Sequence, residues 1–132
     1  MSISLRILIV TTDALFILYW LVAGLSELGV ISVPVESMYA DYQDPRVIAW
    51  NWSFFPLDMI FSLVGLASIR ANRMGNEIWR PLAIISLTLT MTAGGMAVSY
   101  WTILGEFDLS WFLPNLLLVV WPLFYIPKLV RG

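Results

Sequence analysis

The sequence predicts an all-α membrane protein, a bundle of four transmembrane helices that forms a single domain over residues 1–132. Hydrophobic residues make up 60% of the chain and charged residues only 12%, whereas about a quarter of a soluble domain is charged. Four apolar segments also reach the ~20 residues that a helix needs to cross a bilayer. We therefore expect an integral, multi-pass membrane protein.

The first predicted span covers residues 5–28. Arg6 followed by an apolar run has the order of a secretory signal, but this run is longer than the hydrophobic region of most signals and contains Asp13. We therefore expect the segment to be retained as the first helix.

The other spans are expected at residues 49–69, 81–104 and 109–129. Asp44 and Pro45 precede the second span as an N-cap and a first-turn proline would, and Asp108 can cap the fourth. Three prolines in the last span predict that its helix is not straight. The short turn before this span makes the third and fourth helices antiparallel neighbours.

Basic residues concentrate on one side of the four predicted spans. That side carries six of the seven, namely Arg6, Arg70, Arg73, Arg80, Lys128 and Arg131. Only Arg46 falls on the other side. The positive-inside rule therefore predicts that both termini and the loop between the second and third helices lie in the cytoplasm.

The chain contains no cysteine and no histidine. These absences argue against disulfides, thiol chemistry and most zinc or haem ligation, so we expect no metal and no cofactor. The net charge is −2, and no basic cluster occurs outside the short loops, so we do not expect a nucleic-acid partner.

Two carboxylates fall inside predicted spans, Asp13 in the first and Asp58 in the second. A charge in hydrocarbon costs ~3 kcal/mol on insertion scales, so such a residue is a functional-site hypothesis by default. At ~1.5 Å of rise per residue, we expect both carboxyls near one level of the bilayer. No Lys or Arg lies in the middle of a span. A cation, a protonated amine or a proton is therefore the expected counter-charge, unless each acid only caps a kink or binds a neighbouring hydroxyl.

Small and hydroxylated residues recur along one face of the third predicted span. Their steps of four, three, four, three and four match the helical period. The residues are Thr88, Thr92, Gly95, Ser99, Thr102 and Glu106. We expect this face to point into the bundle, either for close helix packing or, in its half from Ser99 to Glu106, as the wall of a polar cavity.

Each of the other spans carries a polar or aromatic stripe, and we expect the four stripes to share one interior. The stripes are Asp13, Trp20, Gly24 and Glu27 in the first span, Asn51, Asp58, Ser62 and Gly65 in the second, and Trp111, Asn115, Pro122 and Tyr125 in the fourth. The predicted ligand-binding residues are Asp13, Trp20, Glu27, Asn51, Asp58, Ser99, Thr102, Trp111, Asn115 and Tyr125.

The run from Ala49 to Asp58, AWNWSFFPLD, follows DYQDP at residues 41–45 and resembles the YvaD-like family of uncharacterised bacterial four-span membrane proteins. The ending from Phe107 to Lys128, with FDLSW and a proline-asparagine pair, resembles the same family. The likeness covers nearly the whole chain. It implies a four-span fold in the cell membrane of a bacterium.

A more distant likeness is to the EXPERA-type four-helix proteins, which include the sigma-2 receptor and emopamil-binding proteins. The matching residues are Asp44, Pro45, Trp50, Ser53, Phe54 and Asp58. This likeness implies that Asp58 faces an amine or a carbocation, with Glu27 or Asp44 as a partner acid. The chain departs from the emopamil-type isomerases because it has no histidine.

We expect a pocket that binds or senses a small apolar or cationic amphiphilic ligand or a membrane lipid, because aromatic faces and a carboxylate together suit a cation. A membrane isomerase is an alternative, with Asp58 and either Glu27 or Asp13 as acid and base. A dimeric transporter of the small multidrug type, with Asp13 as its acid, is another. The chain can also be an accessory subunit, and it can act as a homodimer.

Overall fold

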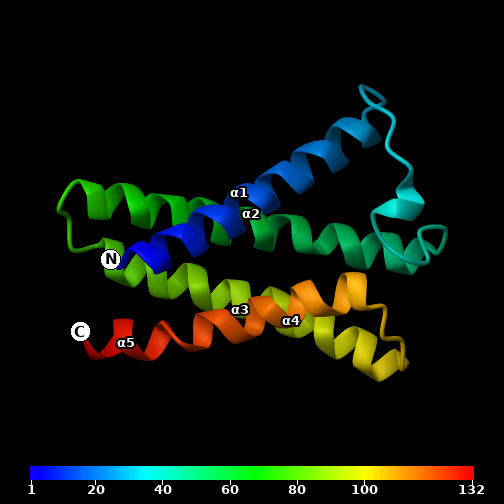
Figure 1. The fold of residues 1–132 in the computed structure, drawn as a ribbon. Helices are drawn as coiled ribbons and strands as arrows, with labels where there is room; N and C mark the ends of the chain where they lie inside the picture. Colours follow the sequence, from blue (N-terminus) through cyan, green and yellow to red (C-terminus); the bar gives the residue numbers. More distant parts are fainter.

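The computed structural model describes all residues 1–132, and every regular element in it is a helix (Figure 1). The elements are α1 (Ile3–Glu27), the short 3-10 helix η1 (Val35–Ser37), α2 (Pro45–Arg73), α3 (Trp79–Leu104), α4 (Leu109–Leu123) and α5 (Ile126–Arg131). Four segments are long and apolar enough to span a membrane, namely α1, α2, α3 and the segment Leu109–Arg131 that combines α4 and α5. The predicted all-α class with four candidate membrane spans is confirmed.

The N-caps of α2 and α4 are the predicted ones. Asp44 accepts a hydrogen bond of 2.8 Å from the N–H of Arg46, and Asp108 accepts one of 3.0 Å from the N–H of Ser110. These bonds satisfy N–H groups that have no partner within the helix. α2 extends beyond the predicted span at both ends, because the helix continues into the polar residues of its first and last turns.

The last span is interrupted, as its prolines predict. α4 ends at Leu123 and α5 begins at Ile126. Pro127 has no N–H to donate to the carbonyl of Leu123, and the N–H of Tyr125 donates to the carbonyl of Pro122 at 3.0 Å in a tighter turn. The span therefore bends close to the end that carries the C-terminus.

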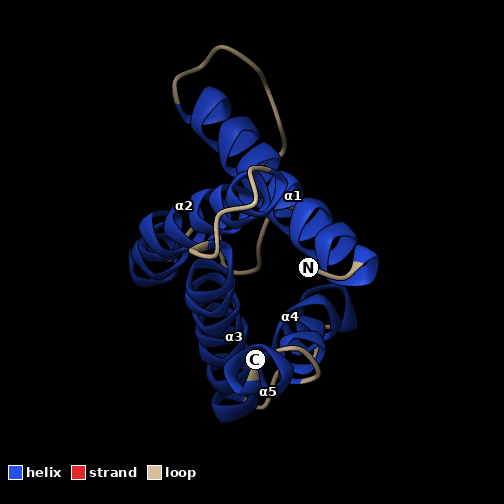
Figure 2. Ribbon diagram, turned by 90° about the vertical axis from the view of Figure 1, so that its left-hand side faces the viewer, coloured by secondary structure: helices blue, strands red, loops and turns tan.

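The helices pack in chain order. α1 packs against α2, α2 against α3 and α3 against α4, while α1 makes no close backbone contact with α3 or α4. Viewed along the bundle, α2 and α3 lie on one side, and α1 and α4 face each other on the other side (Figure 2). Both termini lie at the same end of the bundle (Figure 1). We call this end, with its six basic residues, the basic end, and the opposite end, with η1, the loop end.

An apolar cluster closes the bundle at the basic end. Its buried members come from α1, α2, α3 and α5, and they are Leu5, Ile9, Ile69, Ala83, Leu87 and Leu129. In water, burying each leucine or isoleucine of the cluster would contribute about 1.5–3 kcal/mol of transfer free energy, and in a bilayer the same contacts contribute through packing. No comparable cluster joins α1 to α4 nearer the loop end.

The inward face of α3 consists mainly of small residues, which let its neighbours approach closely. A Cβ on Gly94 would lie 2.6 Å from the backbone oxygen of Asn115 and 2.8 Å from the Cβ of Leu118, both in α4. The hydroxyl of Ser86 donates to the carbonyl of Phe61 in α2 at 2.9 Å. The buried residues of this face are Ala83, Ser86, Leu87, Thr90, Ala93, Gly94, Ala97 and Trp101.

The predicted inward face of the third helix is wrong. Thr88, Thr92, Ser99 and Thr102 are exposed, and a Cβ on Gly95 would meet no atom within 4 Å. The three threonine hydroxyls donate to carbonyls four residues earlier in their own helix, at 2.7–2.9 Å. A hydroxyl satisfied in this way does not need a partner from another helix, so it can face lipid.

Candidate functional site

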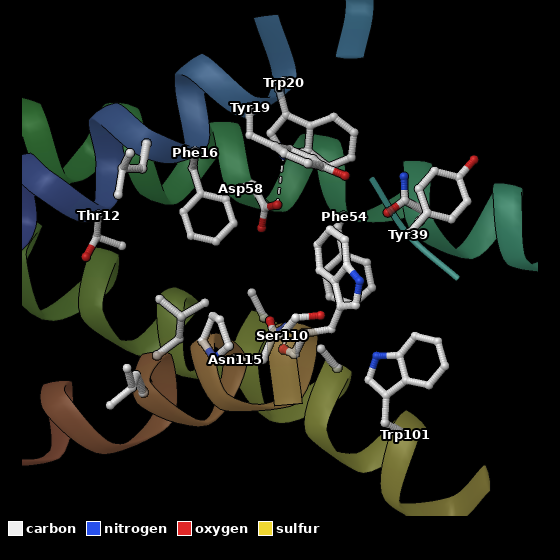
Figure 3. A pocket seen from close by; sticks show the side chains of 18 of the residues that line it. Thr12, Phe16, Tyr19, Trp20, Tyr39, Phe54, Asp58, Trp101, Ser110 and Asn115 are labelled. Atoms are coloured by element: carbon white, nitrogen blue, oxygen red, sulfur yellow. Dashed lines mark hydrogen bonds between the residues drawn. The ribbon is translucent and has the colours of Figure 1, made fainter. Parts of the chain in front are cut away.

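A cavity with a volume of about 540 Å³ lies between α1 and α4 (Figure 3). All four spans contribute to its walls, and Tyr39 from the connection between α1 and α2 borders it near the loop end. Most of its lining residues are hydrophobic. The volume falls within the range of about 300–1,000 Å³ that is usual for small-molecule sites. We refer to this cavity as the pocket.

Asp58 is the only carboxylate that lines the pocket, and it points from α2 toward the interior (Figure 3). Its side chain is 3% exposed. The indole Nε1 of Trp20 in α1 donates a hydrogen bond of 2.8 Å to Oδ2, while Oδ1 has no hydrogen-bond partner. No arginine or lysine contributes to the pocket wall. The carboxylate is therefore oriented by a neutral donor and has no counter-charge within the pocket.

Aromatic rings hold the Trp20 indole in place. Its ring centroid lies 5.0 Å from that of Tyr19, 5.3 Å from that of Trp52 and 5.4 Å from that of Phe55. Such contacts at 4.5–7 Å are favourable, by about 0.5–1.5 kcal/mol for each pair. The donor that faces Asp58 is thus fixed by packing between α1 and α2.

A second aromatic group forms the wall toward the loop end. Trp50 stacks on Tyr100 with centroids 4.1 Å apart and an interplanar angle of 20°. Phe54 and Trp101 meet the same Trp50 ring edge-on, at 4.8 and 6.2 Å. Trp50, Phe54 and Trp101 line the pocket, so a bound cation would meet π faces as well as the carboxylate of Asp58.

The α4 wall is built at the first turns of that helix. The side-chain amide of Asn115 donates to the carbonyl of Trp111 at 2.7 Å, which uses one of its two donor hydrogens. Asp108 caps the helix and also accepts a bond of 2.6 Å from the hydroxyl of Ser110. These two bonds from Ser110 hold the pKa of the Asp108 carboxyl below its usual value. The cap therefore orders the turn that brings Ser110 to the pocket.

The pocket opens sideways between α1 and α4, since these two helices do not pack against each other. Leu15 in α1 and Leu117 in α4 line it and are 60% and 55% exposed. Both residues belong to candidate membrane spans. The opening therefore lies at the depth of the hydrocarbon and has an apolar rim.

Asp13 does not line the pocket. It is 1% exposed and packs against Gly65 of α2 and Ser86 of α3, where a Cβ on Gly65 would clash with its carboxyl. Gly65 follows Asp58 by seven residues, which is roughly 10 Å of helix at 1.5 Å per residue. The expectation that the two carboxyls lie at one level is therefore wrong. α1 and α2 cross so that Asp13 lies closer to the basic end than Asp58 does.

The profile of a family described as "Family of unknown function (DUF5360)" matches residues 5–132. The chain belongs to the DUF5360 family. It is also 42% identical over 127 residues to "Uncharacterized protein YvaD" of Bacillus subtilis (strain 168), an alignment that covers 96% of this chain and 92% of that relative. The resemblance to the YvaD-like family is thus confirmed, and this relative is a bacterial protein. No solved structure matches the chain.

Five of the ten predicted site residues of this DUF5360 chain line the pocket, namely Trp20, Asn51, Asp58, Trp111 and Asn115. They come from α1, α2 and α4, whose predicted stripes face the pocket at these five positions. The other five lie elsewhere. Asp13 is buried below the pocket, Glu27 is exposed at the end of α1, and Tyr125 packs beside the apolar cluster. Ser99 and Thr102 are exposed on the outer face of α3.

Several lining residues were not predicted from the sequence. Thr12, Phe16 and Tyr19 follow one another at steps of four and three along α1, and all three line the pocket. This spacing is readable from the sequence, but the heptad of Asp13 and Trp20 is adjacent to it and carries the stronger polar signal. Trp20 of the adjacent face also lines the pocket, whereas Asp13 does not.

Proposed function

We propose that this protein binds a cationic amphiphile, a molecule with a protonated or quaternary amine and an apolar chain, from within the membrane. The observation that carries the proposal is the environment of Asp58. It is the only carboxylate that lines the pocket. One of its oxygens accepts a hydrogen bond from a neutral indole, and the other has no hydrogen-bond partner. A carboxylate in such surroundings is costly unless a positive charge or a proton accompanies it.

The aromatic walls favour an amine over other positive ligands. Trp20, Trp50, Phe54 and Trp101 line the same pocket as Asp58. Aromatic faces attract quaternary and protonated amines by about 0.5–2 kcal/mol each, and the attraction is larger where water is excluded. A metal ion is a poorer match, because no group of three or more metal-binding acids exists in the structure.

The lateral opening supports a ligand with an apolar chain. A molecule dissolved in the bilayer can enter between Leu15 and Leu117 without crossing a polar surface, since both rim residues are leucines exposed at membrane depth. Its head would then meet Asp58 while its chain stays at the rim. The distant likeness to EXPERA-type proteins agrees with this assignment and stays a prediction.

The rival functions find less support in the geometry. The isomerase hypothesis needs two carboxyls in one pocket, and neither Asp13 nor Glu27 lines it. The small multidrug hypothesis needs Asp13 to face a shared site between two chains, but α2 and α3 of the same chain cover its carboxyl. An accessory role and a homodimer stay predictions that this pocket neither requires nor opposes.

The proposal is tested by quenching of tryptophan fluorescence in nanodiscs. The quencher is a brominated dodecylamine, compared with a brominated dodecanol of equal chain length. We expect the wild type to bind the amine at least tenfold more tightly than the alcohol. Asp58→Asn keeps the shape and a hydrogen-bond acceptor for Trp20, and we expect it to remove this preference.

Glu106→Gln is the matched control. Glu106 is an exposed acid near the loop end of the bundle, and it does not line the pocket. It removes one negative charge from the protein without touching the site, and we expect the amine preference of the wild type. Equal amine preference in wild type and Asp58→Asn would refute the proposal.

A further inference from the structure

Four buried side-chain atoms have no hydrogen-bond partner in the whole chain, and they belong to Arg6, Asp13, Asp58 and Ser62. The other fully buried hydroxyls are satisfied. Those of Ser68, Ser86 and Thr90 each donate to a backbone carbonyl at 2.6–2.9 Å. The unpartnered atoms are therefore not scattered through the core, but occur only on residues of α1 and α2.

These four residues follow one line through the interface between α1 and α2. Asp58, Ser62 and Gly65 lie at steps of four and three on one face of α2, and Asp13 packs against Gly65. Arg6 precedes Asp13 by seven residues on the same face of α1. Each seven-residue step spans roughly 10 Å of helix. The line thus runs from the pocket to the basic end over about 20 Å, most of the ~30 Å hydrocarbon core.

No fixed charge neutralises the middle of this line. A Cβ on Gly65 of α2 would meet the carboxyl of Asp13 and the hydroxyl of Ser86 from α3, and neither Gly65 nor Ser86 is ionisable. The nearest ionisable residues along the line are Asp58 toward the pocket and Arg6 toward the basic end. Ser62 is 0% exposed and lies on the same face of α2 between Asp58 and Gly65, the residue against which Asp13 packs. A hydroxyl in this position can accept a proton on one side and donate one on the other.

We infer that Asp58, Ser62 and Asp13 form a buried proton pathway between the pocket and the basic end, with Asp13 as the residue that holds the proton. In one transfer, the Asp13 carboxyl gives its proton to the Ser62 oxygen, directly or through one water. The Ser62 hydroxyl releases its own proton to the Asp58 carboxylate. Asp13 is then a carboxylate, Asp58 is neutral, and Ser62 is unchanged. This inference uses no ligand and goes beyond the proposed function.

A purely structural role predicts a different pattern. If the serines of α2 only fill space, Ser62→Ala and Ser68→Ala should behave alike, because both side chains are fully buried in the same helix. If Asp58, Ser62 and Asp13 form a proton pathway, only the substitution of Ser62 should slow proton exchange. The hydroxyl of Ser68 is committed to the carbonyl of Gly65 at 2.6 Å and does not lie between the two acids.

The test is infrared spectroscopy of the protein in nanodiscs without any amphiphile, followed after transfer to heavy water. Protonated carboxylic acids give a carbonyl band that is separate from those of carboxylates and amides. We expect Asp58→Asn, in which Asp13 is the remaining buried acid, to retain such a band, and the additional change Asp13→Asn to remove it. We further expect Ser62→Ala to slow the deuterium shift of this band at least tenfold, and Ser68→Ala to leave its rate unchanged.

Two results would overturn the inference. One is equal exchange rates in Ser62→Ala and Ser68→Ala, which would leave Ser62 as a space-filling residue. The other is loss of the Asp13 band on adding sodium chloride at constant pH, which would make Asp13 a sodium site. The amine-binding experiment can succeed or fail in either case, because no ligand is present here.

Discussion

The indole of Trp20 and the carboxylate of Asp58 are joined by a hydrogen bond of 2.8 Å that connects α1 to α2 at the pocket wall. The two residues are 38 positions apart, and both are buried. The bond orients Asp58 without neutralising it, since an indole N–H donates but carries no charge. The pocket therefore keeps a negative group whose position is set by aromatic packing.

Trp20→Phe tests the structural part of this bond. The variant keeps a ring but leaves Oδ2 of Asp58 buried without a donor, and we expect a loss of about 1–3 kcal/mol in the free energy of unfolding. Trp52→Phe is the control, because Trp52 packs on Trp20 but its indole donates no hydrogen bond in the structure. Unfolding in mixed micelles with increasing dodecyl sulfate measures both. Equal losses would mean that ring packing, and not the bond, matters.

Two adjacent glycines in α3 give a matched test of helix packing. A Cβ on Gly94 would meet the backbone of α4 at 2.6 Å, and a Cβ on Gly95 would meet nothing within 4 Å. We expect Gly94→Ala to destabilise the fold by about 1–3 kcal/mol. Gly95→Ala should be neutral or stabilise it by up to ~1 kcal/mol, because alanine favours a helix. The reverse order in the same unfolding assay would contradict the α3–α4 contact.

Leu15→Trp tests the lateral entry. Leu15 lines the pocket and is exposed at its opening, so a larger ring there should narrow the entrance between α1 and α4. We expect amine association to slow several-fold, measured by stopped-flow quenching in nanodiscs. Leu21→Trp places the same ring on an exposed part of α1 that does not line the pocket. Similar rates for the two variants would show that the ligand enters elsewhere.

The orientation of the bundle in the membrane is predicted from its basic end. Gln43 and Asn76 are exposed at opposite ends, and the positive-inside rule assigns Asn76 to the cytoplasm. In whole cells, an impermeant thiol reagent should modify Gln43→Cys and spare Asn76→Cys. Labelling of Asn76→Cys alone would invert the topology. The chain has no natural cysteine, so neither variant has a background signal.

The four spans and their caps could be predicted because each depends on local chemistry. Hydropathy over ~20 residues identifies a span, and Asp44 or Asp108 before an apolar run identifies a helix start. The inward faces of α1 and α2 were also predictable. A carboxylate such as Asp13 or Asp58 within a span has few places to lie other than the interior.

The face of α3 could not be chosen from the sequence, because small residues occur on two of its faces. The exposed face that contains Thr88 and Thr92 and the buried face that contains Ala93 and Gly94 both consist of residues at helical spacing. A hydroxyl that bonds to its own helix tolerates lipid, so polarity does not separate the two faces. The depth difference between Asp13 and Asp58 depends on how α1 crosses α2, which no local pattern encodes.

Photolabelling tests the central claim most directly, because it locates a bound amphiphile. The probe is dodecylamine with a diazirine on its chain, and labelled peptides are identified by mass spectrometry. We predict labels on α1 and α4 near Leu15 and Leu117, competed by unlabelled dodecylamine and lost in Asp58→Asn. Labels spread over the exposed outer face of α3, around Ile85 and Met96, and unchanged in Asp58→Asn would contradict an amine site in the pocket.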